Sequence, residues 1–264
     1  MKIRHLLLAG YGAAVFIGTS AFAQPAVDVN QVIHELEASG ALDKAVAQSL
    51  KRLERQRLQE QKRQEAQALK IQAAKAVKAR AVNPDADFIF GNPNAEVSII
   101  VYSDFECPYC KRYHDTPKQV AETMGPDVNV VFRNFPLGFH DPVATQEAIA
   151  AICAYEQGGS SAFWQYADGV MAKTESNSKG MPGDKPLQAL AQQNHLDVAL
   201  FDRCLQSVGA RERIQADLQD GERAGVNGTP ATILRNNKTG RSTFLSGAVP
   251  KAALQSAVQD LQGK

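Results

Sequence analysis

The sequence predicts an α/β domain with an inserted helical block, preceded by a separate helical segment. An apolar, β-branched run at residues 97–102 leads into a Cys-Pro-Tyr-Cys motif and then a helical pattern. From residue 142 to about 223, helical patterns alternate with glycine-rich breaks. Residues 28–80 contain no proline and a single glycine, which is typical of long helices.

The first 23 residues have the pattern of a signal peptide. Lys2 and Arg4 precede an apolar run at residues 6–17, and the small-residue site Ala21-Phe22-Ala23 follows. A transmembrane anchor needs about 20 apolar residues, and this run is shorter. We therefore expect cleavage after Ala23 and export, in the style of a bacterial periplasmic protein.

The charge balance excludes one class of partner. The chain has 29 basic and 28 acidic residues, and removal of Lys2 and Arg4 leaves 27 − 28 = −1. Because its basic and acidic residues are nearly equal in number, the chain lacks the excess of positive charge that is typical of a nucleic-acid-binding protein. All four cysteines fall in the exported part, where paired thiols are favoured.

The segment 24–50 is predicted to form oligomerisation helices. One apolar helical face is formed by Val29, Val32, Ile33 and Leu36. The pattern is interrupted at Ser39-Gly40. A second apolar stripe follows at Leu42, Val46, Leu50 and Leu53. A short amphipathic helix cannot bury such a face alone, so we expect it to pack on two or three copies of itself. Packing back on its own domain and partial disorder are the alternatives.

Residues 51–83 are predicted to form a charged linker helix. This stretch is dense in Lys, Arg, Glu and Gln, which is typical of a solvated helix between two bodies. An alanine-rich run continues the helix to Asn83-Pro84, where we expect it to end.

Residues 84–264 are predicted to form the catalytic domain, with the helical insertion at about 142–223. Strands are expected at 88–90, 97–102, 128–135, 231–234 and 242–245, and helices at 111–124, 144–157, 162–173, 186–194, 197–207, 210–224 and 250–261. The first half is a βαβ unit and the last a ββα unit.

The motif Cys107-Pro108-Tyr109-Cys110 is typical of a redox dithiol. A strand-to-helix turn places Cys107 at a helix N-terminus, where unpaired N–H groups and the helix dipole favour a thiolate. The thiolate is the nucleophile in disulfide exchange. Pro108 suits the first helical turn, and Cys110 lies on the same helix face as Cys107.

Other uses of a C-x-x-C motif are less favoured. Structural zinc needs two more ligands, and His114 is the one nearby candidate. A structural disulfide over so short a loop gives little entropic stabilisation. Thiolates also bind Cu(I), but the chain has four Met and no Met-rich or His-rich tract. We therefore expect no metal and no cofactor.

Three motifs together resemble the DsbA-like branch of the thioredoxin superfamily. They are residues 104–110 (Asp-Phe-Glu-Cys-Pro-Tyr-Cys), 132–137 (Phe-Arg-Asn-Phe-Pro-Leu) and 225–230 (Gly-Val-Asn-Gly-Thr-Pro). The resemblance covers about residues 88–261 and implies a thioredoxin-like fold with a helical insertion. It implies that Cys107 attacks disulfides, that Cys110 resolves the mixed disulfide, and that Thr229-Pro230 is a cis-proline loop facing the dithiol and pairing with substrate.

The N-terminal segment is similar to the oligomerisation segments of DsbC and DsbG isomerases and of trimeric ScsC proteins. This implies a homodimer or homotrimer acting as a disulfide isomerase or reductase on misoxidised exported proteins, with a DsbD-like or DsbB-like membrane redox partner. A DsbA-type oxidase is the close alternative. A copper-binding protein and a non-catalytic periplasmic chaperone are alternatives of another class.

The remaining candidates are secondary. Cys153 and Cys204 either bridge each other or stay as small buried thiols. Asp104 and Glu106 either handle protons for Cys110 or are solvated loop carboxylates. We expect His114 on the helix exterior and assign no role to His140 or His195.

Overall fold

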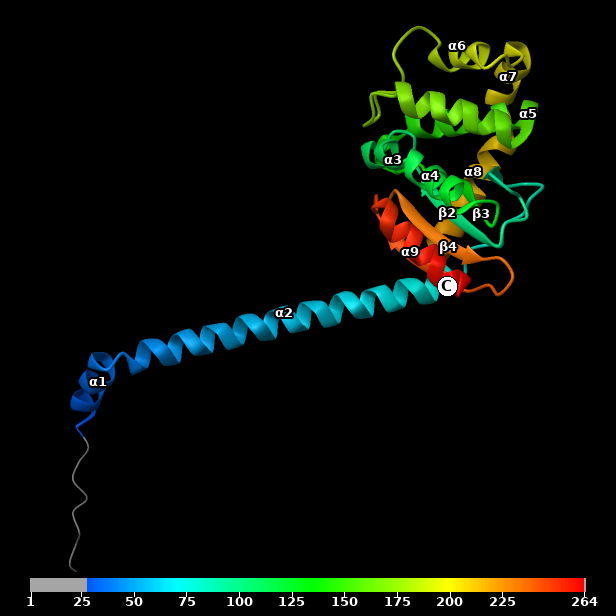
Figure 1. The fold of residues 1–264 in the computed structure, drawn as a ribbon. Helices are drawn as coiled ribbons and strands as arrows, with labels where there is room; N and C mark the ends of the chain where they lie inside the picture. Colours follow the sequence, from blue (N-terminus) through cyan, green and yellow to red (C-terminus); the bar gives the residue numbers. More distant parts are fainter. Residues whose placement is uncertain (1–27, 264) are drawn as a thin grey trace, which may run out of the picture. The chain divides into compact units, whose positions relative to one another are not determined.

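The computed structural model describes residues 28–263 (Figure 1). The predicted signal peptide and its cleavage site lie outside these residues. The chain divides into two units between Gln61 and Lys62, and each unit is described by itself. No helix among residues 28–263 is both long and apolar enough to cross a membrane.

The N-terminal unit is helical. Helix α1 (Val29–Ala38) begins at Asp28, whose carboxylate accepts hydrogen bonds from the N–H groups of its first turn. The predicted break at Ser39-Gly40 is confirmed, because Gly40 takes a left-handed φ of +64° before helix α2 (Ala41–Ala76) begins.

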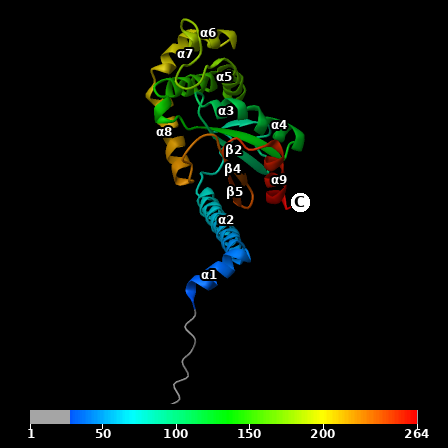
Figure 2. The ribbon, with the colours of Figure 1, turned by 90° about the vertical axis from the view of Figure 1, so that its left-hand side faces the viewer.

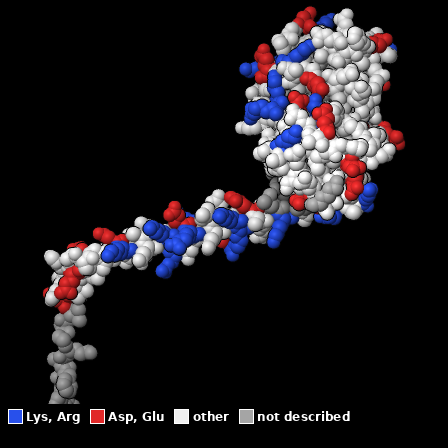
Figure 3. Space-filling model, viewed as in Figure 1, with Lys and Arg blue, Asp and Glu red and all other residues white. Residues whose placement is uncertain are grey.

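The apolar stripes of α1 and the first part of α2 face solvent in the single chain. Their exposed members are Val29, Val32, Ile33, Leu36, Leu42, Val46, Leu50 and Leu53. Beyond this apolar stripe, Lys and Arg side chains lie on the surface of α2 (Figure 3). The single chain therefore leaves its predicted oligomerisation surface uncovered.

The expectation that the linker helix continues to Asn83 was wrong. Helix α2 ends at Ala76, and both Ala76 and Ala79 are buried in the core of the second unit. One hydrogen bond and one ion pair of Arg80 hold the segment that follows α2 against the helix at Val208–Arg223. The Arg80 N–H donates to Asp220 at 2.7 Å, and its guanidinium bonds to Asp217 at 2.9 Å.

The second unit is built on a five-stranded sheet in the order β1-β3-β2-β4-β5 (Figures 1 and 2). Its strands are β1 (Phe88–Phe90), β2 (Val97–Ser103), β3 (Val128–Asn134), β4 (Ala231–Asn236) and β5 (Ser242–Ser246). Strands β2 and β3 are parallel and the other pairs are antiparallel. This confirms the predicted α/β fold with βαβ and ββα halves.

The period-two alternation of the strands divides the core between the two faces of the sheet. Ile99 and Phe132 belong to one apolar cluster, which is covered by α4 (Asp115–Met124), α5 (Val143–Lys173) and α9 (Lys251–Gln262). Ile100 and Tyr102 belong to the other, which includes Ala76 and the end of α8 (Val208–Arg223).

The helices appear in the predicted order. They are α3 (Pro108–Tyr113), α4 (Asp115–Met124), α5 (Val143–Lys173), α6 (Pro186–Gln193), α7 (Val198–Leu205), α8 (Val208–Arg223) and α9 (Lys251–Gln262), with a 3₁₀ turn η1 (Gly138–His140) before α5. Gly158 and Gly159 kink α5 where the sequence predicts a break. A disulfide between Cys153 and Cys204 joins α5 to α7.

Candidate active site

Cys107 lies where β2 gives way to α3. It is the N-cap of that helix, and Pro108 occupies the first turn, where its missing N–H costs no hydrogen bond. Cys107 and Cys110 are free thiols, and both are buried. The strand-to-helix turn predicted from the sequence is therefore present.

The pKa values of the two thiols are shifted in opposite directions. A hydrogen bond from the Cys110 side chain is the largest influence on Cys107 and lowers its pKa to about 6, despite the opposing effect of burial. Backbone N–H groups of Cys110 and Tyr109 contribute further. Burial, followed by the neighbouring Cys107 thiolate, raises the pKa of Cys110 well above its ordinary value. At neutral pH the site holds one thiolate and one thiol.

The Thr229–Pro230 peptide bond is cis, and Thr229 faces the dithiol. The Cys107 sulfur lies 3.4 Å from the Thr229 carbonyl oxygen, to which it donates a hydrogen bond when it is protonated. The structure thus brings the cysteine motif and the Gly-Thr-Pro loop together across 122 residues of chain.

A groove of about 360 Å³ runs beside Cys107, and its lining is mostly apolar. Tyr109 and Phe139 line it and are 58% and 75% exposed. Large exposed aromatic side chains beside a reactive atom are typical of a binding surface. Phe139 was missed in the sequence because a single aromatic residue in a loop carries no pattern.

Asp104 is buried, so its interpretation as a solvated loop carboxylate was wrong. Its carboxylate accepts hydrogen bonds from the Leu137 N–H at 2.9 Å, the Glu106 N–H at 2.8 Å and the His140 ring at 2.6 Å. Burial raises the pKa of Asp104 against these opposing bonds. Its backbone N–H reaches the Cys110 sulfur at 3.5 Å, which ties this network to the dithiol.

Glu106 is also buried, so it too is not a solvated carboxylate. Its carboxylate accepts hydrogen bonds from the Thr174 hydroxyl and, at 3.1 Å, from the Gly180 N–H. Its backbone carbonyl accepts from the Asn177 N–H at 2.8 Å. The residue before Cys107 is therefore anchored in the loop that follows α5.

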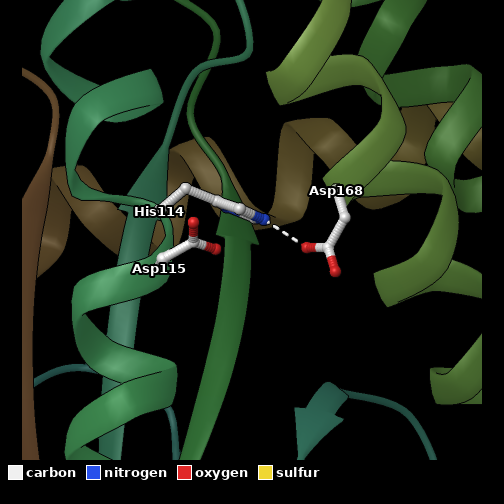
Figure 4. Close-up of side chains that lie close together, drawn as sticks. All are labelled: His114, Asp115 and Asp168. Atoms are coloured by element: carbon white, nitrogen blue, oxygen red, sulfur yellow. Dashed lines mark hydrogen bonds and ion pairs between the residues drawn. The ribbon is translucent and has the colours of Figure 1, made fainter.

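His114 is not on the helix exterior, because its side chain is 6% exposed and points to Asp168 on α5 (Figure 4). The two groups are 2.6 Å apart. Although burial opposes it, hydrogen bonds from His114 and Lys118 lower the pKa of Asp168.

Within residues 28–263, His114, Asp115 and Asp168 are the one group of three potential metal ligands close enough to share an ion. The Lys118 ammonium lies 2.6 Å from Asp168 and 3.0 Å from Asp115. This lysine therefore places one positive charge between the two carboxylates.

Comparison with known proteins places the chain in a family. The thioredoxin family profile matches residues 83–259. DsbA2 of Pseudomonas aeruginosa is 34% identical, with a TM-score of 0.60 over 67% of this chain and 94% of that protein. The chain therefore belongs to the thioredoxin family. Within it, the chain is DsbA-like.

Two further structures resemble more of the chain at lower identity. BcfH of Salmonella enterica Typhimurium is 18% identical, with a TM-score of 0.70 over 90% of this chain and all of that protein. A linker-deletion mutant of Proteus mirabilis ScsC is 18% identical, with a TM-score of 0.59 over 92% of this chain and 99% of that one. At this identity the likeness is one of fold.

Curated sequence relatives include Na⁺/H⁺ antiporters. The NhaA 3 antiporter of Salinispora tropica is 31% identical over 157 residues, which are 60% of this chain and 23% of the antiporter. The chain thus spans about a quarter of the length of the curated relatives that it matches.

Proposed function

We propose that this chain is a periplasmic thiol:disulfide interchange protein in which Cys107 attacks and Cys110 resolves. One observation carries the proposal: a hydrogen bond from the Cys110 thiol, followed by backbone N–H groups at the start of α3, lowers the pKa of Cys107 to about 6, while Cys110 is buried and keeps its proton. Such asymmetry suits a nucleophile and a resolving group.

The reaction follows from this asymmetry. The Cys107 thiolate attacks one sulfur of a substrate disulfide, and the other sulfur leaves as a thiolate. Cys110 then loses its proton and attacks the Cys107 sulfur, which releases the second substrate thiol and forms the Cys107–Cys110 disulfide. Alternatively, the freed substrate thiolate attacks a second disulfide of the same substrate, and the thiolate released there attacks the substrate sulfur bound to Cys107. This last exchange releases the Cys107 thiolate, so the pairing is rearranged without net oxidation.

The groove beside Cys107 supports a polypeptide substrate. The cis proline leaves the backbone of Thr229 facing the thiolate, where an extended chain can pair with it. The exposed rings of Tyr109 and Phe139 provide apolar contacts for unfolded segments. Asp104, with its hydrogen bond to the imidazole of His140, is the candidate proton acceptor for Cys110.

The exposed stripe of α1 and α2 supports the isomerase direction. Pairing of two or three copies through Ile33, Leu36 and neighbouring apolar residues would bury that surface and raise the local concentration of dithiols. The likeness to BcfH and ScsC covers at least 90% of the chain, more than the catalytic domain alone. A DsbD-like membrane reductant would keep such an isomerase reduced.

Oxidation is the second candidate, because the 34% identical relative is named DsbA2. In that case a DsbB-like membrane partner would keep Cys107 and Cys110 as a disulfide, and the helical segment would not contribute to turnover.

Refolding of a scrambled-disulfide substrate tests the proposal. Ile33→Lys places a charge in the stripe of α1, and His34→Lys is the matched control on the opposite face of the same helix. We expect Ile33→Lys to dissociate the oligomer and lose isomerase activity while it still reduces simple disulfides, and His34→Lys to behave as wild type. Equal isomerase activity in an Ile33→Lys monomer would show that the stripe is not needed for isomerisation, and a wild type without isomerase activity would overturn the isomerase direction. Loss of all activity in Cys107→Ala is required in either direction.

A further inference from the structure

Glu147 on α5 is a buried carboxyl group that the redox reaction does not use. It is 2% exposed, and neither of its carboxyl oxygens accepts a hydrogen bond within the described part of the chain. A carboxylate in such a place would bear the full cost of losing its water.

The group next to Glu147 is another carboxyl, that of Glu106, on the other side of Gly180. Gly180 sits between them: its N–H is 3.1 Å from Glu106 Oε2, and a Cβ atom on it would lie 4.0 Å from Glu147 Oε1. No lysine, arginine or histidine among residues 28–263 forms an ion pair with either carboxyl. Two adjacent buried carboxyls without a cation cannot both ionise.

The hydrogen bonds show which of the two keeps the proton. Both oxygens of Glu106 accept, one from the Thr174 hydroxyl and one from the Gly180 N–H, which is the environment of an ionised carboxylate. Glu147 has no such donors, and protonation would turn one of its oxygens into a donor toward Glu106. Burial, followed by the charges of Glu106 and Asp104, raises the pKa of Glu147 to about 9.

The other groups around Glu147 do not compensate a charge there. On α5 itself the phenol of Tyr166 is buried and donates to the Leu187 carbonyl at 3.0 Å. Asp104 is acidic, and His140 bonds to Asp104. Lys179 shares a cavity of about 240 Å³ with Glu147, but it is exposed to solvent.

The Glu106 side chain organises the loop that follows α5, which we call the strap (residues 174–180). Ser176, Asn177 and Ser178 in the strap all have left-handed φ values of 61°, 56° and 66°. Such a run of non-glycine residues needs support from its surroundings. The support comes from the bonds to Glu106 and from Ser178, whose hydroxyl donates to the Phe139 carbonyl at 3.1 Å.

The strap forms one wall of the groove beside the reactive cysteine. Asn177 and Phe139 line that groove together with Cys107 and Thr229. The position of Glu106, directly before Cys107, thus connects the carboxyl pair to both the nucleophile and the groove wall.

We propose that Glu147 and Glu106 share a single proton, and that neutral Glu147 is a positioning residue which holds Glu106, the strap and Cys107 in place. The shared proton is a property of the folded chain alone, whereas the positioning role rests on the proposed disulfide exchange. The pair would keep one negative charge near Cys107 at neutral pH, where two would oppose thiolate formation.

Infrared spectroscopy of the full-length protein tests the shared proton. We expect the C=O band of a buried protonated carboxyl at neutral pH, its loss with a midpoint near pH 9, and its absence in Glu147→Gln. Glu175→Gln, in the exposed part of the strap, is the matched control and should keep the band. In Glu106→Gln the midpoint should fall, because the neighbouring charge is gone. A band that Glu147→Gln leaves intact, or a midpoint that Glu106→Gln leaves unmoved, would overturn the proposal.

The pH dependence of mixed-disulfide formation tests the positioning role separately. Wild type should lose rate above pH 9, approaching about tenfold per pH unit as Glu147 ionises. Glu147→Gln should match the wild-type rate at neutral pH and lack the high-pH decline, since the amide cannot ionise. A decline that persists in Glu147→Gln would refute the positioning role. An inactive wild type with the infrared behaviour intact would instead refute the proposed function.

Discussion

Acidic side chains are buried in two regions of the catalytic unit, and the two regions treat them differently. Around Arg133, three aspartates lie with guanidinium groups: Asp220 is 2.6 Å and Asp87 3.4 Å from Arg133, and Asp217 is 2.9 Å from Arg80. Around Cys107, the carboxyls of Asp104, Glu106 and Glu147 are equally buried, and within residues 28–263 the imidazole of His140, which contacts Asp104, is the one basic side chain bonded to them.

The difference separates scaffold from site. The aspartates around Arg133 link β2, β3, α8 and the segment after α2, so their charges are paired for structure. The carboxyls around Cys107 are left without guanidinium groups, so their protonation can respond to the dithiol and to pH. Perturbed acidity that burial produces beside a groove is a mark of functional sites.

The largest expected effect comes from a substitution that removes the ion pairs around Arg133. Arg133→Met leaves the buried carboxylate of Asp220 without its guanidinium and should lower the free energy of unfolding by about 3–5 kcal/mol. Denaturant unfolding measures this. Arg223→Met is the control, since Arg223 is 58% exposed and 3.4 Å from Asp220, and it should change little. A loss under about 1 kcal/mol for Arg133→Met would show that the network is not structural.

The second prediction concerns the carboxyls around Cys107, where a substitution should raise the free energy of unfolding instead of lowering it. The pKa of Glu147 is raised from 4.5 to about 9, so between these values the folded protein keeps a proton that the unfolded chain releases. Wild-type stability should therefore fall as pH rises through this window, by up to about 1.4 kcal/mol per pH unit. Glu147→Gln should flatten that slope and be more stable than wild type at alkaline pH. Parallel slopes in the two proteins would contradict the assignment.

Much of this comparison was outside the reach of the sequence. The strands, the helical insertion and the positions of Cys107 and Pro230 were predictable, because apolar periodicity and the Cys-Pro-Tyr-Cys and Gly-Thr-Pro motifs are local signals. The end of α2 at Ala76 was not, because Asp217 and Asp220, which bond to Arg80, lie about 140 residues away.

Burial of charge was equally unpredictable. Asp104 and Glu106 stand in a loop sequence that looks solvated, and their donors at Leu137, Thr174 and Gly180 come from distant segments. Glu147 occurs in an ordinary helical pattern. A single sequence shows which side chains can titrate but not which of them lose water.

A smaller effect is expected from removing the Tyr102 hydroxyl, which also bonds to Asp220 in the network around Arg133. The Tyr102 hydroxyl donates to Asp220 at 2.5 Å, and Tyr102→Phe removes this bond while leaving the Arg133 pair in place. The free energy of unfolding should fall by about 1.5 kcal/mol, the lower end for a bond to a charged group. Thermal unfolding at neutral pH checks the value. A loss as large as that of Arg133→Met would mean that the hydroxyl, and not the guanidinium, compensates Asp220.

The smallest effect belongs to a pair outside both regions. Lys238 and Glu96 lie 2.9 Å apart, with the lysine side chain 72% exposed. Solvent and salt screen such a pair, so Lys238→Ala should leave the unfolding midpoint unchanged. A measurable loss would show that burial is not what distinguishes the ionic contacts of this domain.

Trapping of the mixed disulfide tests the central claim most directly. Cys110→Ala, incubated with a disulfide-bonded unfolded substrate, should accumulate a covalent adduct that mass spectrometry locates at Cys107, because the resolving thiol is absent. Cys107→Ala should form none, since burial keeps the Cys110 thiol protonated and hidden. An adduct at Cys110, or no adduct in either variant, would contradict the assignment of Cys107 as the attacking nucleophile.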